Sequence, residues 1–481
     1  MEFEKELIGR ASNIPGMLVF DLPVHGDARG WFKENWQRAK MIQEGLPDFG
    51  PVQNNVSFNA QRGVTRGIHA EPWDKFISVA SGSVFGAWVD LRPGESFGQV
   101  CTCVIDPSKA IYVPRGVGNS YQALEDGTVY SYLVNAHWSA DRKSEYTFVN
   151  LADPSLGIDW PIPLEDAILS EADKNHPTLE NAIPMNPRRV LVTGGRGQVG
   201  TALKKLADQR SLVGWEFADA DELDITDAEA LARLDWDAYG TVINCAAFTA
   251  VDAAELPEKK ATVWSVNVSG PANLAKICLE HNLTLVHISS DYVFDGVQEL
   301  HSEEERLAPL GVYGQTKAAA DCVVSCVPRH YILRTSWVVG EGNNFVRTMA
   351  SLSNRCALPA EVDNRLSQIT VVDDQFGRLT FADTLAEAIL HVLDAGVPYG
   401  AYNVSNSGDI ASWYEIAREV FRRVNGNPEA VAPVSTSQYA KNAPGPVSPR
   451  PTHSGLALRK IEEVGYEPVD WKEALGEYLN A

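Results

Sequence analysis

From about residue 50 to residue 150, the chain shows short β-rich runs with a period of two. The clearest case is VFGAWVDL at 84–91, where successive side chains would fall on opposite faces, the period of a β-strand. Similar β-rich runs, separated by turns rich in Gly, Ser and Pro, occupy residues 75–92, 98–105, 110–114 and 128–134. Strands at a spacing of about 8–12 residues predict an all-β sandwich, jelly roll or barrel.

The pattern changes near residue 187, after a proline-bearing connector at 181–189. From there apolar runs alternate with helical stretches, which predicts a Rossmann-type, doubly wound parallel sheet in an α/β domain. The segment 412–481 reads as a small α-rich cap. We therefore expect a two-domain protein, with an all-β domain at 1–186 and an α/β domain at 187–481.

Composition narrows the class of protein. The 481 residues include 41 basic and 63 acidic side chains, a net charge of −22 with histidine neutral, which disfavours nucleic acid and acidic lipid as partners. No apolar run reaches the ~18 residues of a membrane span, and the acidic start MEFEKELIGR does not read as a secretory signal. Seven cysteines, with Cys101 and Cys103 predicted to pack on one strand face, fit a reduced cytoplasm.

A glycine-rich turn opens the second domain. Gly194, Gly197 and Gly200 follow an apolar strand and precede a helix, where backbone N–H groups can approach a pyrophosphate at the helix N-terminus. Asp219, near the end of the next strand, is suited to a ribose hydroxyl, whereas Arg196 in the turn is suited to a 2′-phosphate. The sequence therefore predicts a dinucleotide site and leaves NADH and NADPH open.

A second motif is Tyr313-Gly-Gln-Thr-Lys317. The i,i+4 spacing places both side chains on one helix face, where the lysine ammonium would lower the pKa of the phenol and make it a proton donor near neutral pH. Ser290, at the end of a predicted strand, would supply a further hydroxyl to the reacting oxygen.

With these motifs, the second domain resembles the extended short-chain dehydrogenase/reductases, and specifically the dTDP-4-dehydrorhamnose reductases. The matching stretches include GQVG (197–200), ELDITD (222–227), HISSDYVFDG (287–296), YGQTKAAAD (313–321) and RPTHSGLAL (450–458).

The resemblance assigns roles to particular residues. It implies Tyr313 as proton donor, Lys317 as its partner and Ser290 where the family has Thr, for reduction of the C4 ketone of a 4-keto-6-deoxy sugar by NADPH or NADH. Mg²⁺, which some members hold through a Glu after the glycine turn, is doubtful because Thr201-Ala202-Leu203 stands there. The implied cofactor contacts are Gly194, Gly197, Gln198, Val199, Gly200, Ala246, Ala247 and Thr249, and the implied sugar contacts are Asp291, Tyr292 and Trp337.

The first domain contains a candidate general base, His69, because imidazole is the side chain that titrates near neutral pH. Lys75, Tyr132, Asp153 and Arg66 are further candidates for chemistry. A metal-binding β-barrel would need at least two histidines, typically as H-x-H, together with a carboxylate. The sequence has no H-x-H pair, so we predict no metal.

This domain resembles the dTDP-4-dehydrorhamnose 3,5-epimerases, which implies a cupin-like jelly roll. The resemblance implies His69 as the base at C3 and C5, Asp153 as its carboxylate partner, Lys75 as the group stabilising the enolate and Tyr132 as the acid on the opposite face. Its matching pieces include DARGWFKE (27–34), QNNVS (53–57), GVTRGIH (63–69), YVPRGVG (112–118) and DPSLGIDWP (153–161), and its implied nucleotide contacts are Arg29, Glu34, Gln53, Asn55 and Arg66.

Three places in the sequence depart from the epimerase pattern. RGLHYQ becomes RGIHAE at 66–71, A-H-G-F becomes Gly118-Asn119-Ser120-Tyr121 with loss of a histidine, and a strand Asp becomes Gly86. The departures leave open whether one or two centres are inverted.

Together the domains predict a bifunctional cytoplasmic enzyme that converts dTDP-4-dehydro-6-deoxy-D-glucose to dTDP-L-rhamnose. Two alternatives stand: a single epimerisation giving another deoxysugar, or a β domain that only binds or oligomerises. A homodimer is expected by resemblance alone.

Overall fold

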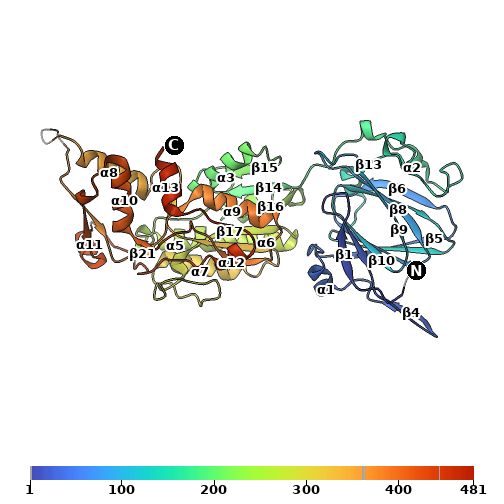
Figure 1. Cartoon of the computed structure of the whole chain (residues 1–481), viewed down its shortest axis with the longest axis horizontal. Helices are drawn as coiled ribbons and strands as arrows, with labels where there is room; N and C mark the ends of the chain where they lie inside the picture. Colours follow the sequence, from blue (N-terminus) through green and yellow to red (C-terminus); the bar gives the residue numbers. More distant parts are fainter. Residues whose placement is uncertain (1–2, 360–361, 363, 444, 481) are drawn as a thin grey trace. The chain divides into compact units, whose positions relative to one another are not determined.

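The structure is a computed structural model that describes residues 3–359, 362, 364–443 and 445–480. The chain folds into two compact units, Met1–Pro187 and Arg188–Ala481, so the division lies one residue beyond the expected boundary. Figure 1 shows a β-rich unit in blue and teal and an α/β unit from green to red. Within the described residues, no helix is both long and apolar enough to cross a bilayer.

The first unit consists mainly of two antiparallel sheets, of strand order β1-β2-β10-β7-β12-β5 and β13-β6-β11-β8-β9. Trp88, Tyr121 and Tyr130 belong to an apolar cluster contributed by both sheets. The sheet strands are β1 (Ile8–Ala11), β2 (Leu18–Asp21), β5 (Gln53–Asn59), β6 (Thr65–Ala70), β7 (Lys75–Ser81), β8 (Val84–Asp90), β9 (Val100–Ile105), β10 (Lys109–Val113), β11 (Val117–Ala123), β12 (Thr128–Val134) and β13 (Thr147–Phe148).

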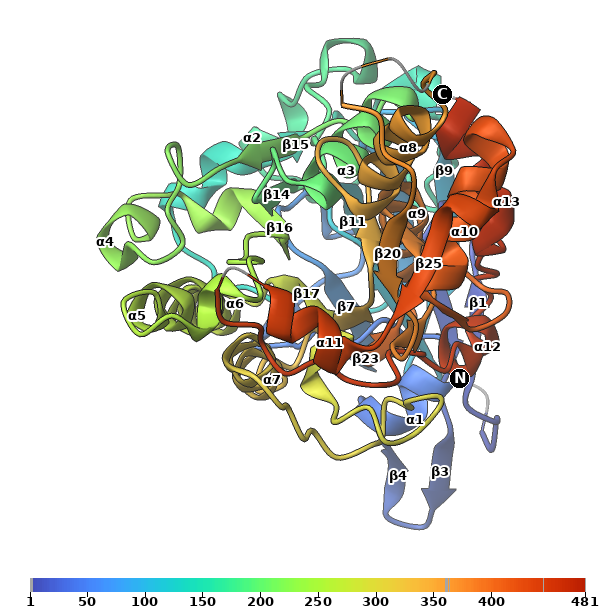
Figure 2. The same ribbon diagram turned by 90° about the vertical axis from the view of Figure 1, so that its left-hand side faces the viewer.

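Three smaller features complete this unit. A hairpin of β3 (Val24–Asp27) and β4 (Gly30–Lys33) projects from it (Figure 2). Two short helices are α1 (Arg38–Gln43) and α2 (Glu171–Lys174).

Strand β8 is buried on both faces, although its alternating pattern predicts one face only. Val84 and Trp88 pack between the sheets, whereas Val89 packs against Val149 and Leu151, from the segment that follows the strands. We call residues 149–182 the covering segment, since they pack over this outer face. The segment contains α2, which lies against β6.

The second unit is built on a parallel six-stranded sheet of order β15-β14-β16-β17-β18-β23. Leu191 packs with α6 and α7 on one face, and its neighbour Val192 packs with α3 and α9 on the other, which makes the sheet doubly wound. The bounds are β14 (Arg189–Thr193), β15 (Trp215–Ala218), β16 (Tyr239–Asn244), β17 (Thr284–Ser290), β18 (His330–Thr335), β23 (Gly400–Asn403), α3 (Gln198–Gln209), α4 (Ala228–Leu231), α5 (Lys260–Trp264), α6 (Gly270–Glu280), α7 (Val312–Val324), α9 (Ala382–Asp394) and α12 (Arg459–Glu463).

The second unit has a second apolar core, which includes residues of the predicted cap at 412–481 and also earlier residues. It joins α8 and β20 to α10 and β25, and β20 pairs in parallel with β25, so it recruits residues well before 412. The elements are α8 (Phe345–Cys356), α10 (Trp413–Asn425), α11 (Thr436–Asn442), α13 (Trp471–Asn480), β19 (Val338–Val339), β20 (Ile369–Val372), β21 (Phe376–Gly377), β22 (Thr380–Phe381), β24 (Ala411–Ser412) and β25 (Val431–Val434).

Candidate active sites

Arg66 and His69 lie on β6, where a bulge turns both side chains to one face. His69 is opposite Asn119 of β11, and Arg66 is opposite Tyr121, so three residue steps on β6 match two on β11. Asn119 and Tyr121 share a strand face because they are two residues apart. Tyr121 packs in the core between the sheets, so this face is the inner one.

Lys75 and Tyr132 meet in the same inner space. The buried Lys75 Nζ is 2.9 Å from a carboxylate oxygen of Glu71 and 5.6 Å from the ring centroid of Tyr132. Burial raises the pKa of Tyr132 to about 12 and the Glu71 charge adds to this, while Arg66 and a hydrogen bond with Asn55 oppose it. The phenol is therefore held protonated, the form that can donate a proton.

Strand β5 directs two of the predicted nucleotide contacts to this side. Asn55 is opposite Tyr132 in the β5–β12 ladder, and Gln53 Nε2 donates to Asn55 Oδ1 at 2.8 Å. The alternate side chains Val56 and Phe58 are 64% and 65% exposed. The structure thus brings Gln53 and Asn55 together with Tyr132.

The carboxylate partner of His69 is Asp173. His69 Nε2 is 2.8 Å from Asp173 Oδ1, and the two side chains are 31% and 7% exposed. Burial alone would raise the pKa of Asp173, but the hydrogen bond with His69 holds it below the ordinary value. The backbone N–H of Asp173 donates to the Ser170 hydroxyl at 3.1 Å, which fixes α2 and this carboxylate against β6.

The prediction that Asp153 is that partner is wrong. Its Oδ1 accepts hydrogen bonds from the backbone N–H and hydroxyl of Ser155 at 2.9 and 2.7 Å, and its Oδ2 accepts from the Leu179 N–H at 2.6 Å. Asp153 therefore caps a short turn, and both of its oxygens are engaged in holding the covering segment.

Sequence reasoning also missed His176. Its ring centroid is 5.3 Å from that of His69 and 4.7 Å from that of Phe148. Asn150 Nδ2 donates to the carbonyls of Lys174 and His176 at 3.0 and 3.1 Å and so clamps the turn that carries this imidazole. No sequence spacing signals it, because β6 and this turn lie about a hundred residues apart.

Arg29 and Glu34 are not with the other predicted contacts of this unit. Both belong to the β3–β4 hairpin and its exit, which project from the sheets (Figure 2). Arg29, 89% exposed, pairs with Asp27 at 2.5 Å, and Glu34 pairs with Lys40 at 2.6 Å.

In the second unit, the glycine turn fits a pyrophosphate. A Cβ on Gly194 would lie 2.6 Å from the Ala246 nitrogen, and one on Gly200 would lie 2.4 Å from the Gly194 carbonyl oxygen. Gly197 caps α3, and Gln198 and Val199 form its first turn. The turn thus packs tightly against the loop after β16 and leaves the N-terminus of α3 free of side-chain caps.

The other predicted cofactor contacts surround this turn. Ala246 N–H donates to Asn244 Oδ1 at 3.2 Å, and Ala247 and Thr249 follow in the same loop. Asp219 Oδ2 accepts from the backbone N–H of Arg196 at 2.9 Å. The Arg196 guanidinium also pairs with Asp219 at 3.4 Å, so the residues suited to a ribose hydroxyl and to a 2′-phosphate are in contact.

Ser290 and Asp291, both buried, meet the half-buried Tyr313 at the carboxyl end of β17. Ser290 Oγ donates to Asp291 Oδ1 at 3.0 Å. Burial raises the pKa of Tyr313 to about 12, partly opposed by a hydrogen bond with Ser290, and burial raises the pKa of Asp291 to about 6.

The prediction that Lys317 lowers the pKa of Tyr313 is not met in this structure. Lys317 Nζ donates to the Ile288 carbonyl at 2.5 Å and lies 3.3 Å from His287 Nε2, while burial lowers the pKa of Lys317 to about 8. The ammonium is thus engaged by β17, and burial dominates the titration of the phenol.

His287 is a buried polar residue that sequence reasoning missed. Its Nδ1 is 3.0 Å from Asn244 Nδ2, and Asn244 Oδ1 accepts from the Thr193 hydroxyl at 2.8 Å. Burial, with the nearby Lys317 charge, holds the pKa of His287 well below its ordinary value. A network across three strands therefore fixes Lys317.

The predicted sugar contacts Tyr292 and Trp337 differ in their surroundings. The Tyr292 and Tyr313 rings are 5.5 Å apart and nearly perpendicular, so Tyr292 adjoins the predicted proton donor. Trp337 stacks on Trp413 of the second core at 3.8 Å. Burial raises the pKa of Tyr292, and the charge of Arg450, a residue that sequence reasoning also missed, opposes this rise. Arg450 pairs with Asp252 at 2.9 Å.

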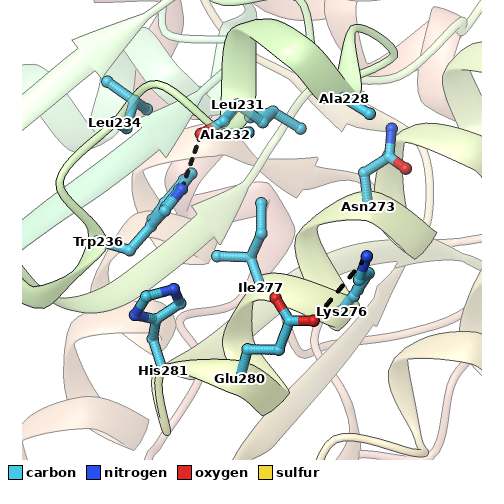
Figure 3. A pocket seen from close by; sticks show the side chains of 10 residues that line it. All are labelled: Ala228, Leu231, Ala232, Leu234, Trp236, Asn273, Lys276, Ile277, Glu280 and His281. Atoms are coloured by element: carbon cyan, nitrogen blue, oxygen red, sulfur yellow. Dashed lines mark hydrogen bonds and ion pairs between the residues drawn. The ribbon is translucent and has the colours of Figure 1, made fainter.

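This unit also has two hollows away from the group at the end of β17, one of which borders the predicted cofactor contact Gln198. The groove in Figure 3, about 370 Å³, is lined by α4, α6 and the intervening segment, with Trp236, Ile277 and His281 among its residues. A cavity of about 560 Å³ lies between α3, α9 and α13 and includes Gln198 and Lys205 in its lining.

The α3 surface does not fit a Mg²⁺ site. Lys205 pairs with Asp383 of α9 at 3.6 Å, and Arg210 pairs with Glu387. Mg²⁺ requires several free oxygen ligands, and these carboxylates already face cations.

Both halves of the chain match known families. Residues 11–181 match the family described as dTDP-4-dehydrorhamnose 3,5-epimerase, and residues 188–481 match the RmlD substrate binding domain. The first half is 57% identical over 192 residues to the "Protein RmlC homolog" of Streptococcus pyogenes serotype M6, which covers 39% of this chain and 96% of that protein.

Relatives of the second half are reductases. The dTDP-4-dehydrorhamnose reductase of Mycolicibacterium smegmatis is 36% identical over 303 residues, which is 61% of this chain and 86% of that protein. The crystal structure of a dTDP-4-dehydrorhamnose reductase from Clostridium acetobutylicum is 34% identical and covers 61% of this chain and 98% of that one, with a TM-score of 0.54. The reductase from Bacillus anthracis, in complex with NADP, is 31% identical and covers 61% and 99%, with a TM-score of 0.53.

The fold and its site residues define a Rossmann-type oxidoreductase joined to a β-sheet epimerase-like domain. The chain belongs to the RmlD family over residues 188–481 and to the dTDP-4-dehydrorhamnose 3,5-epimerase family over residues 11–181.

Proposed function

We propose that this chain is a bifunctional enzyme of dTDP-L-rhamnose biosynthesis, which epimerises dTDP-4-dehydro-6-deoxy-D-glucose at C3 and C5 and then reduces C4. The observation that carries the proposal is that each unit holds its own acid–base set: His69 with Asp173, Lys75 and Tyr132 in one, and Ser290 with Tyr313 in the other. Two separate sets suit two consecutive reactions at one carbonyl.

In the epimerase half, His69 removes the proton at C3, and the C–H electron pair moves to the C4 oxygen as an enolate. The proton is acidic because it flanks the C4 ketone. Asp173 stabilises the imidazolium that forms, and the Lys75 ammonium stabilises the enolate oxygen. Tyr132 returns a proton to the other face of C3. His69 then releases its proton to solvent and Tyr132 takes one up, which restores both groups before the same exchange at C5.

In the reductase half, Tyr313 protonates the C4 oxygen, and Ser290 holds that oxygen by a hydrogen bond. A nicotinamide cofactor bound at the glycine turn supplies the hydride to C4. The NADP complex of the Bacillus anthracis relative and the Arg196–Asp219 pair are compatible with NADPH or NADH. Lys317, held by the Ile288 carbonyl, would contact the ribose of a bound dinucleotide.

Incubation of the purified chain with the dTDP-4-keto sugar, with and without NAD(P)H, tests the proposal. We expect dTDP-L-rhamnose with the cofactor, and deuterium incorporation at both C3 and C5 in D₂O without it. Reduction of the unepimerised ketone as the sole reaction would contradict the proposal.

A single epimerisation is the second candidate, favoured by Asn119. This residue stands opposite His69 where the family has a histidine, and its amide oxygen accepts from Trp88 Nε1 at 2.9 Å and Tyr130 OH at 3.1 Å. Deuterium at only one carbon would establish this alternative.

A non-catalytic β domain is the third candidate, and His69→Ala separates it from the proposal. We expect at least a ~10²-fold loss of deuterium exchange, whereas a binding module would be unaffected.

The finer features of the fold belong to the same proposal. The two sheets form a cupin-like jelly roll, and the second core closes over the sugar as a cap. A location in the cytoplasm is supported by the seven free cysteines of the described chain, as expected in a reducing compartment.

A homodimer formed through the β unit would explain why Arg29 and Glu34, two predicted nucleotide contacts, lie on the projecting hairpin and its exit. The projecting hairpin exposes Trp31 and Phe32 at 40% and 67%, and in a dimer it would carry Arg29 to the pocket of a second copy. Light scattering of the full chain tests this, and a monomer would contradict it.

A further inference from the structure

The side chains of His69, Asp173 and His176 converge at one point. Each offers a nitrogen or oxygen donor, and these donor atoms all lie within 4.8 Å of one another. Among the described residues, this is the one group of three His, Cys, Asp or Glu side chains that lie close enough together to share an ion. Two imidazoles and one carboxylate are the donor types that Zn²⁺ and related divalent transition metals prefer.

Two further observations point to a ligand at this cluster. The Nδ1 atom of His176 is buried without a hydrogen-bond partner, an arrangement that costs free energy unless something fills it. His69 is 31% exposed, so the cluster is reachable from solvent. The Asn150 clamp on the turn keeps His176 beside His69.

We propose that His69, Asp173 and His176 form a binding site for Zn²⁺ or a similar divalent transition metal, and that the bound ion inhibits the epimerase half. The ion would join the two imidazoles and the carboxylate, with metal–donor distances of about 2.0–2.2 Å, so the three donors must close together around it.

Inhibition follows from the chemistry of the imidazole. If the ion binds Nδ1 of His69, that lone pair is blocked directly. If it binds Nε2, the ring proton resides on Nδ1 and the neutral ring has no free lone pair. In either case His69 cannot accept the proton from the sugar, while the reductase half keeps its own proton donor.

Titration of the EDTA-treated full chain with ZnCl₂ in a calorimeter tests binding without reference to activity. We expect one micromolar site in the wild type and at least ~10-fold weaker binding in both His69→Ala and His176→Ala. His281→Ala is the matched control. His281, which lines the groove of Figure 3, pairs with Asp237 at 3.1 Å, but within the described residues this pair belongs to no group of three donors close enough to share an ion. Equal affinity in all four proteins would overturn the site.

A second experiment measures zinc inhibition and rests on the proposed function. If the epimerase activity is absent, the calorimetric titration still tests the zinc site by itself. We expect micromolar Zn²⁺ to suppress deuterium exchange at least ~10-fold in the wild type, with recovery on adding EDTA, and to leave reduction of pre-epimerised substrate unchanged. In His176→Ala the inhibition should need at least ~10-fold more Zn²⁺. Equal loss of both activities would overturn selective inhibition.

X-ray absorption at the zinc edge identifies the donors. Nitrogen and oxygen neighbours alone support the site. Sulfur neighbours would place the ion on the exposed thiols of Cys322 and Cys326 and overturn it.

Discussion

Asp153 and Asp173 are both buried aspartates of the covering segment, but only Asp173 reaches the base. Each carboxylate accepts or shares hydrogen bonds shorter than 3 Å. The difference is the partner: an imidazole that must become cationic during proton transfer, or backbone N–H groups that never change charge. This difference predicts opposite consequences for the same substitution.

Asp173→Asn should lower epimerisation by about 10²-fold or more, because the imidazolium loses its counter-charge. Asp153→Asn should keep a rate near that of the wild type and lower the stability of the β unit by about 1–2 kcal/mol, because an amide nitrogen cannot accept from the Leu179 N–H. Deuterium exchange and calorimetric unfolding measure the two effects. The reverse pattern would reinstate Asp153 as the partner.

Asp291 makes a pH-dependent contribution to stability. Burial raises its pKa to about 6, above the ordinary value of about 3.9, so between pH 4 and 6 the native state binds more protons than the unfolded state. The contribution of this group to stability therefore falls as pH rises through that window and stays low above it.

Asp291→Asn should accordingly stabilise the second unit by about 1–3 kcal/mol at pH 8 and by clearly less at pH 5. Calorimetry of the full chain can follow this, because NADP added to the sample shifts the transition of the unit that binds it. An equal gain at both pH values would contradict the raised pKa.

At the scale of single elements, the periodicity of the sequence predicted those strands and turns that depend on residues close together in the chain. The strands around 75–134 and the glycine turn at 194–200 follow from residue pattern because neighbours in sequence specify them. The β20–β25 pair joins residues about 60 positions apart, and no local pattern reports such a partner. The apolar core that contains this pair therefore includes residues well before 412, where the predicted cap begins.

The candidate site of the β unit was also predicted only in part. Lys75 and Tyr132 sit on strands that can be read from the sequence, whereas His69 lies on β6, outside the predicted runs and beside a register shift. Asp173 lies on a four-residue helix whose position depends on packing against β6, and sequence alone could not distinguish it from Asp153. The departures at Gly86 and Asn119 both adjoin Trp88: a Cβ at Gly86 would lie 2.3 Å from the Trp88 ring, and that indole donates to Asn119.

The β6 bulge depends on Gly67. Its φ is +122°, and a Cβ there would lie 2.4 Å from Ser120 Cβ and 2.7 Å from the Asn119 carbonyl oxygen. Gly94 has a similar φ of +133° with no atom within 4 Å of its Cβ position. A side chain at either position would strain the backbone, because both φ angles are positive. Only a side chain at Gly67 would also clash with β11.

Gly67→Ala should destabilise the β unit by about 1–3 kcal/mol more than Gly94→Ala and should also reduce epimerisation, because Arg66 and His69 would no longer face one side. Unfolding midpoints and deuterium exchange of the two variants measure this. Equal effects would show that strain alone, and not the close approach of β11, governs the bulge.

At the scale of the whole molecule, the two sites are chemically independent: one exchanges protons beside a ketone, and the other reduces it. Each compact unit contains its own acid–base residues. If the epimerised ketone leaves one site as a free product, it can be used by the second site of any copy of the chain.

Mixing two inactive variants tests this independence. His69→Ala should lack epimerisation and Tyr313→Phe should lack reduction while still binding NAD(P)H, so neither alone should make dTDP-L-rhamnose. Their mixture should form it after a lag in which the ketone accumulates, at a rate that rises with the concentration of the His69→Ala protein, because that protein supplies the reductase. Fusion raises the local concentration of the second site, so the wild type should show a shorter lag at equal site concentrations. A mixture that forms no product would mean that the ketone passes only between sites of one chain, and the two units would then have to act as a single assembly.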